Sequence, residues 1–148
     1  MFNHVVLRVV AKFIIPFIMI YAFYVQLHGE YSPGGGFQAG VILAAAFILF
    51  CIIYGLKKTY QVVSINELMV SACLGALIYI SVGFATIFME GNFLNYSVLS
   101  ENKITGQHIG ITIIELGVGI TVFSAMMLIF CLFCHRLEGK NLKSGAKR

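Results

Sequence analysis

Glu115 is the residue best suited to chemistry, because it alone carries a charge in the otherwise apolar stretch 104–135. A carboxylate inside such a stretch costs several kcal/mol unless it is paired, hydrated or protonated. At about 100° per residue, His108, Thr112 and Gly119 lie on the same helical face as Glu115. Three interpretations of Glu115 stay open. It hydrogen-bonds a neighbouring subunit, or its carboxylate extends to the membrane surface at the lipid edge. In the third, it lines the route of a proton or cation, since a carboxylate binds Na⁺ through oxygen and can relay a proton.

A glycine-rich segment at 33–40 is the second unusual feature. Consecutive glycines at a helix start are costly in backbone entropy, so we expect the fold to need their backbone there. One interpretation is a tight turn whose small residues, continued by Ala44, form a helix-packing stripe. The other is that exposed N–H groups contact an ion or a water path. The turn and packing motif consists of Pro33, Gly34, Gly35, Gly36, Phe37 and Gly40.

Two further charged residues also have two interpretations each. Glu67 begins a weaker polar stripe that continues through Ser71 and Gly75, and it either contributes to the ion path or serves as an ordinary acid in the first turn of a helix. Lys12 lies within an apolar stretch. It either extends its ammonium group to the membrane surface or faces a partner or an aqueous cavity.

The segment 131–135, Cys-Leu-Phe-Cys-His, matches the attachment sequence of c-type haem. That haem is attached on the outer side of a bacterial membrane, whereas the distribution of basic residues places His135 inside. Cys131, Cys134 and His135 would also give zinc only three ligands. We therefore predict no cofactor, no metal site and no catalytic residues.

The composition shows which elements must position these residues. Of the 148 residues, 59% are hydrophobic and 11% are charged, whereas soluble domains are about 25% charged. Four stretches approach or exceed the roughly 20 residues that a membrane-spanning helix needs. We predict a single all-α integral membrane domain with short loops, helices at about 5–27, 36–54, 67–89 and 107–134, and a basic tail at 135–148. Little chain remains for an independent enzyme or for binding nucleic acid.

The basic residues predict the orientation of the four helices. The formal net charge is +4, and nine of the ten Lys and Arg residues precede the first helix, lie near its start, join the second to the third, or follow the fourth. Lys103 is the exception. Because positive residues concentrate on cytoplasmic loops, we predict that both termini are cytoplasmic, and that the basic tail touches anionic lipid.

Two motifs together resemble a known family. The segment 28–40, His-Gly-Glu-Tyr-Ser-Pro-Gly-Gly-Gly-Phe-Gln-Ala-Gly, and the segment 115–119, Glu-Leu-Gly-Val-Gly, are similar to those of the MnhB family, whose members are small subunits of the Mrp-type cation/proton antiporters. The resemblance covers nearly the whole chain. It implies a small, non-catalytic subunit of a cell-membrane hetero-oligomer that exchanges Na⁺ for H⁺, completing the assembly and lining the cation route. The alternative is the equivalent subunit of a membrane-bound hydrogenase or a related ferredoxin-linked complex.

Overall fold

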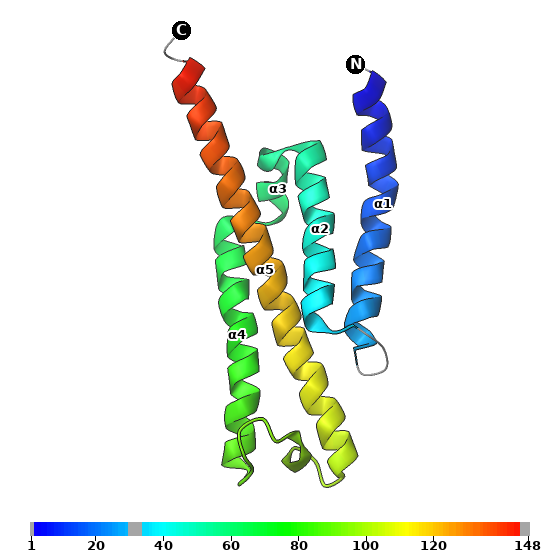
Figure 1. Cartoon of the computed structure of the whole chain (residues 1–148), viewed down its shortest axis with the longest axis vertical. Helices are drawn as coiled ribbons and strands as arrows, with labels where there is room; N and C mark the ends of the chain where they lie inside the picture. Colours follow the sequence, from blue (N-terminus) through cyan, green and yellow to red (C-terminus); the bar gives the residue numbers. More distant parts are fainter. Residues whose placement is uncertain (1, 30–33, 146–148) are drawn as a thin grey trace.

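The computed structural model describes residues 2–29 and 34–145, and this part of the chain is helical without any strand. Its elements are α1 (Phe2–Leu27), α2 (Gly36–Tyr54), α3 (Leu56–Val62), α4 (Ile65–Phe88), the 3-10 helix η1 (Tyr96–Val98) and α5 (Lys103–Gly145), shown in Figure 1. Within the described ranges, α1, α2, α4 and α5 are long and apolar enough to cross a membrane. The prediction of an all-α chain with four spans is confirmed.

The helix ends differ from the predicted ones mainly in α5. This helix begins at Lys103 rather than at 107 and continues into the predicted tail as far as Gly145. Its start is capped by Asn102, whose Oδ1 accepts a hydrogen bond of 3.1 Å from the Ile104 N–H. Extending a helix that has already formed is far cheaper than nucleating one. The tail therefore continues the helix over most of its length.

The connection between α2 and α4 contains a helix where only a loop was predicted. Gly55 ends α2 with φ of 87°, and its N–H donates to the Cys51 carbonyl at 2.8 Å. The chain then forms the seven residues of α3. Ser64 starts α4 through a capping box with Glu67, in which each side chain accepts a hydrogen bond from the other residue's backbone N–H.

α5 is the central helix, because it packs against α2 on one side and α4 on the other, while α1 packs mainly on α2. Residues from α2, α4 and α5 meet in a buried cluster made of Ala44, Leu68, Met127 and Cys131. Phe47 and Phe123 extend this cluster, with ring centres 5.2 Å apart in an edge-to-face arrangement. The core therefore follows α5, the helix that α2 and α4 share.

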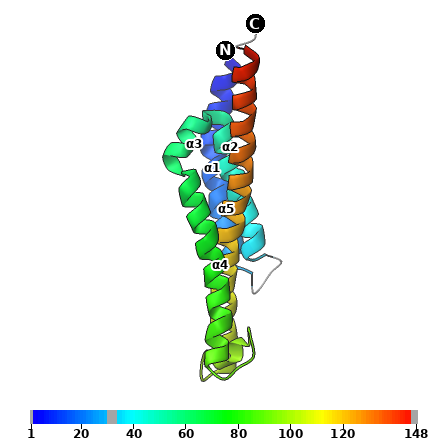
Figure 2. The ribbon, with the colours of Figure 1, turned by 90° about the vertical axis from the view of Figure 1, so that its left-hand side faces the viewer.

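The α1–α2 hairpin and α4 are staggered along α5. A Cβ atom on Gly36, the first residue of α2, would overlap the backbone of Glu115. Gly75, in the middle of α4, lies against Gly117 and Thr121, less than two turns farther along α5. The start of α2 thus lies near the level of the middle of α4, and Figure 1 and Figure 2 show α4 and α5 extending well past the hairpin turn.

The loop between α4 and α5 folds back onto these helices. Thr86 is fully buried, and its hydroxyl accepts a hydrogen bond from the Leu94 N–H at 3.0 Å. The Phe93 ring covers Gly83, and the Tyr96 ring covers Gly110. Burial raises the pKa of the Tyr96 phenol, and the nearby Tyr79 contributes in the same direction. The loop is therefore a packed cap on one end of the α4–α5 pair.

Candidate functional site

The structure brings Glu115 and the glycine turn together, although they are far apart in the sequence. The Glu115 carboxylate lies against the backbone of the hairpin that joins α1 to α2. A Cβ atom on Gly29 would overlap both carboxylate oxygens, and one on Gly35 would lie 2.9 Å from Oε1. The Glu115 side chain is half-buried. An ionisable group thus occupies the space next to two residues that have no side chain.

The conformation of the turn depends on Gly35. Its φ of 105° lies in the region that favours glycine. Its N–H donates to the Val25 carbonyl of α1 at 3.3 Å, and its own carbonyl accepts from the Ala39 N–H of α2 at 3.1 Å. These bonds close the hairpin and begin α2, so the conformation of Gly35 fixes the backbone that Glu115 meets.

The small residues Gly36, Gly40 and Ala44 of α2 form a close contact with α5. Gly36, Gly40 and Ala44 are all buried. A Cβ atom on Gly40 would lie 2.7 Å from the Gly119 carbonyl oxygen, which is closer than real Cβ contacts come. Phe37, in contrast, is 64% exposed and packs little within this chain. Pro33 lies outside the described residues, and Gly34 is near the Val25 carbonyl.

The other residues of the predicted stripe on α5 lie nearer its start and are exposed. The Thr112 hydroxyl donates to the His108 carbonyl at 2.8 Å. Both side chains are exposed, whereas Glu115 and Gly119 face the hairpin and are partly or fully buried. The stripe therefore divides into an exposed part at His108 and Thr112 and a covered part at Glu115 and Gly119.

Glu67 lies in a different part of the molecule. Its carboxylate accepts the Ser64 N–H at 2.7 Å in the capping box of α4, and the residue is exposed. Glu67 therefore lies in the first turn of α4, where a helix-start acid is expected. Its neighbour Leu68 packs with Met127, which is twelve residues beyond Glu115 in α5, so Glu67 and Glu115 are roughly 18 Å apart along the helix axis.

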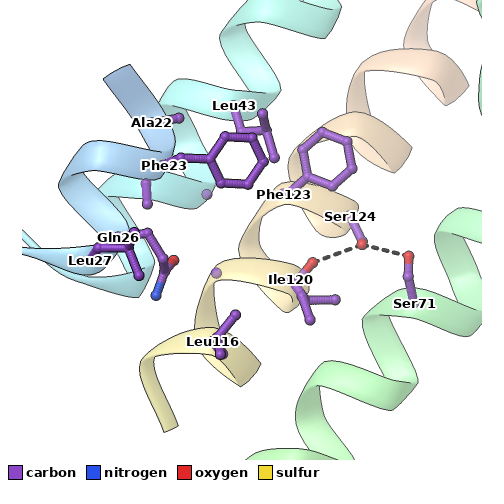
Figure 3. Close-up of a pocket in the computed structure, with 13 residues that line it drawn as sticks. Ala22, Phe23, Gln26, Leu27, Leu43, Ser71, Leu116, Ile120, Phe123 and Ser124 are labelled. Carbon is purple, nitrogen blue, oxygen red and sulfur yellow. Dashed lines mark hydrogen bonds between the residues drawn. The ribbon is translucent and has the colours of Figure 1, made fainter. Parts of the chain in front are cut away.

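A cavity of about 390 Å³ lies between α1, α2, α4 and α5, and its lining on α5 begins at Leu116, the residue after Glu115. Its walls are mostly apolar, and the polar side chains that line it are Gln26, Ser71 and Ser124. The Ser71 and Ser124 hydroxyls are 2.6 Å apart, and Ser124 also donates to the Ile120 carbonyl at 2.7 Å, as Figure 3 shows. A Cβ atom on Gly119 would lie 2.5 Å from Gln26 Oε1.

Sequence reasoning missed Gln26 and Ser124. A pattern for Ser124 exists, because Gly117, Thr121 and Ser124 recur at spacings of four and three residues, as expected for the packing face of a helix. Gln26 has no comparable pattern near the end of α1. Its position against Gly119 depends on how the hairpin folds.

The cysteine–histidine segment does not form a ligand cluster among the described residues. Cys131 is fully buried in the core, Cys134 is partly buried and His135 is exposed. No group of three or more His, Cys, Asp or Glu side chains that could hold a metal occurs in the described ranges. The packing role of Cys131 is that of a small hydrophobic residue.

Comparison with known proteins identifies the family. Residues 6–128 match the family model described as "Domain related to MnhB subunit of Na+/H+ antiporter". The chain belongs to the MnhB family. A protein of Staphylococcus haemolyticus, strain JCSC1435, named "Putative antiporter subunit mnhB2", is 29% identical over 133 residues. Its namesake in Staphylococcus aureus, strain Newman, is 31% identical over 130 residues, and each match covers 86% of this chain and 92% of the relative. As an MnhB-family chain, the protein is a subunit of an Mrp-type Na⁺/H⁺ antiporter, and the other subunits are its partners.

Proposed function

We propose that Glu115 and the glycine turn of this MnhB-family chain form an ion-handling site where it meets another antiporter subunit, and that the chain also contributes to assembly. The observation that carries this proposal is the position of the Glu115 carboxylate against Gly29 and Gly35. A carboxylate can carry a proton or provide oxygen ligands to Na⁺. Both cargoes of the antiporter are therefore compatible with one group.

The exposed residues beside Glu115 support a location at an interface between subunits. His108 and Thr112 continue from Glu115 toward the start of α5 on a surface that the hairpin does not cover. A neighbouring subunit that packs on this surface would connect them with Glu115. Glu67, roughly 18 Å farther along the bundle, would join the same path only through residues of partner subunits.

The orientation of the chain in the membrane is part of the proposal. Both chain ends lie at the same end of the bundle (Figure 1), together with the α2–α3 connection that carries Lys57 and Lys58. Since basic residues concentrate at that end, we place it on the cytoplasmic side of the cell membrane. Glu115 then lies in the outer half of the bundle.

The test is Glu115→Gln, which keeps the size of the side chain and one acceptor oxygen but removes its charge. We expect Na⁺-dependent proton flux in membrane vesicles to fall more than about tenfold, since the amide can neither carry the proton nor compensate a cation. The amount of assembled complex should stay normal. Glu101→Gln, at an exposed position in the loop before α5, is the matched control and should keep full flux.

Unchanged flux through a normally assembled Glu115→Gln complex would refute the proposed site. Purification of the native complex tests whether the antiporter works alone or within a larger redox-driven assembly. Antiporter-like subunits without redox partners support a stand-alone antiporter, whereas hydrogenase or iron–sulfur subunits would place the same site in a redox-driven ion pump.

A further inference from the structure

A groove at the end of the bundle that carries the chain termini combines two cations with an apolar wall. The groove has a volume of about 410 Å³ and lies between α1 and the corner where α2 meets α3. It is lined by Lys12, Ile15, Pro16, Phe50, Tyr54 and Lys58. Lys12 and Lys58 are exposed, and Lys58 Nζ lies 5.6 Å from the centre of the Tyr54 ring. The two lysines come from helices that are distant in sequence, so the fold brings them to one groove.

A second cavity of about 260 Å³ adjoins the first, because Ile15 and Phe50 line both. Its remaining lining residues are Met19, Ala46, Phe47 and Val62. All four are apolar. The one on α1, Met19, lies farther from the N-terminus than Lys12. Together the two cavities form a slot that is cationic at one end and apolar along the rest of its length.

The depth of Lys12 requires something to compensate its charge. The residue lies about two helical turns after Val5, where the apolar span of α1 begins, or roughly 10 Å along the axis. A lysine ammonium at such a depth is costly in hydrocarbon unless it meets an anion or water. None of the residues that line the groove is acidic, so an anion that enters the groove would supply a counter-charge that the groove's own side chains do not.

We propose that this slot binds one anionic glycerophospholipid. The phosphate of the headgroup lies between the ammonium groups of Lys12 and Lys58, and an acyl chain follows Ile15 and Phe50 into the apolar part. Basic pockets between membrane helices commonly bind anionic lipid headgroups. A free phosphate would leave the apolar part of the slot empty, and an apolar helix of a partner would leave the two ammonium groups uncompensated. The lipid would support α1, which packs mainly on α2.

The experiment uses the whole antiporter complex in proteoliposomes that contain a trace of phosphatidylglycerol with a photoreactive acyl chain. After illumination, mass spectrometry locates the labelled peptides. We expect labelling of the α1 and α2 segments around Ile15 and Phe50 to exceed that by the matching phosphatidylcholine probe at least fivefold. The double variant Lys12→Gln with Lys58→Gln should lose this excess. Lys57→Gln, a neighbouring exposed lysine that does not line the groove, should keep it.

Three results would overturn the proposal. Equal labelling by the two lipids would show ordinary contact with the bilayer, and labelling that persists in the double variant would remove the role of the two lysines. A photoreactive amino acid introduced at Ile15 that crosslinks to another subunit, rather than to lipid, would show that a protein fills the slot. If the double variant fails to assemble, the comparison of the two lipids on the unaltered complex still decides the question. The site does not depend on transport through Glu115, and Glu115→Gln should leave the labelling unchanged.

Discussion

The two packing faces of α5 use small residues in the same way but differ in their polar groups. Toward α4, Gly75 lies against Gly117 and Thr121, and Ser71 bonds Ser124 at 2.6 Å. The Thr121 hydroxyl on this face also donates to a carbonyl of its own helix, at 2.8 Å to Gly117. This contact contains only neutral groups that find their partners within the helix pair.

Toward the α1–α2 hairpin, α5 offers the same kind of close approach but adds a carboxylate. Gly36 and Gly40 meet the backbone of Glu115 and Gly119, and the Glu115 side chain extends over Gly29. The α4 face shows that close helix packing in this chain is achieved without a charge. Close packing alone does not require a glutamate at residue 115, and the difference between the faces is what the ion-handling role proposed above would produce.

The largest expected effect tests whether the two faces are equally close-packed. Gly36→Val and Gly75→Val each place side-chain atoms onto the backbone of α5. We expect each to destabilise the chain by about 3 kcal/mol, the upper end for overpacking, because backbone cannot move aside easily. The measurement is the amount of chain recovered in the purified complex. Ala45→Val and Ala76→Val, at exposed positions of the same helices, are the controls. If Gly36→Val were recovered like Ala45→Val, the hairpin would not lie as close to α5 as described.

An intermediate effect isolates the Glu115 carboxylate. The atoms nearest to the new Cβ of Gly29→Ala belong to the Glu115 side chain, whereas those nearest to the new Cβ of Gly36→Ala belong to the Glu115 backbone. Shortening Glu115 to Ala should therefore relieve the first variant and not the second. In a double-mutant cycle on stability, we expect an interaction free energy of about 1 kcal/mol between Gly29→Ala and Glu115→Ala. The value for Gly36→Ala with Glu115→Ala should be near zero. Heat-induced loss of the chain from the complex measures both. Equal coupling in the two cycles would contradict the placement of the carboxylate over Gly29.

The smallest effect concerns the neutral face. Ser71→Ala and Ser124→Ala should show a coupling of about 0.6 kcal/mol, the average for hydrogen bonds between membrane helices. Na⁺-dependent proton flux should stay within about twofold of the unaltered complex, since neither hydroxyl is required to carry charge. Loss of flux in either variant, in a complex that still assembles, would move the ion path from the hairpin face toward the α4 face.

Local patterns in the sequence predicted the four spans and the stripe of Gly36, Gly40 and Ala44, because length and spacing alone determine them. The sequence also singled out Glu115 and the glycine turn separately. It could not predict their contact, which depends on how far the hairpin is shifted along α5. α3 was missed because a seven-residue helix is too short for its periodicity to be recognised. The exposure of Phe37 likewise could not be predicted from the residues around it in the sequence, because an aromatic residue is common both at packed positions and at positions that face lipid.

The stagger of the helices gives the chain a different outline at each end. In the half of the bundle nearer the chain termini, α2 packs on α5 and α1 packs mainly on α2, whereas α4, α5 and the packed loop continue beyond the hairpin turn (Figure 1). A straight helix of a neighbouring subunit can therefore contact either the α1–α2 pair or the α4–α5 pair over its full length, but not both. A partner that covers both helix pairs needs a surface with a matching stagger. Adjacent subunits would then interlock along the membrane normal and resist sliding past one another.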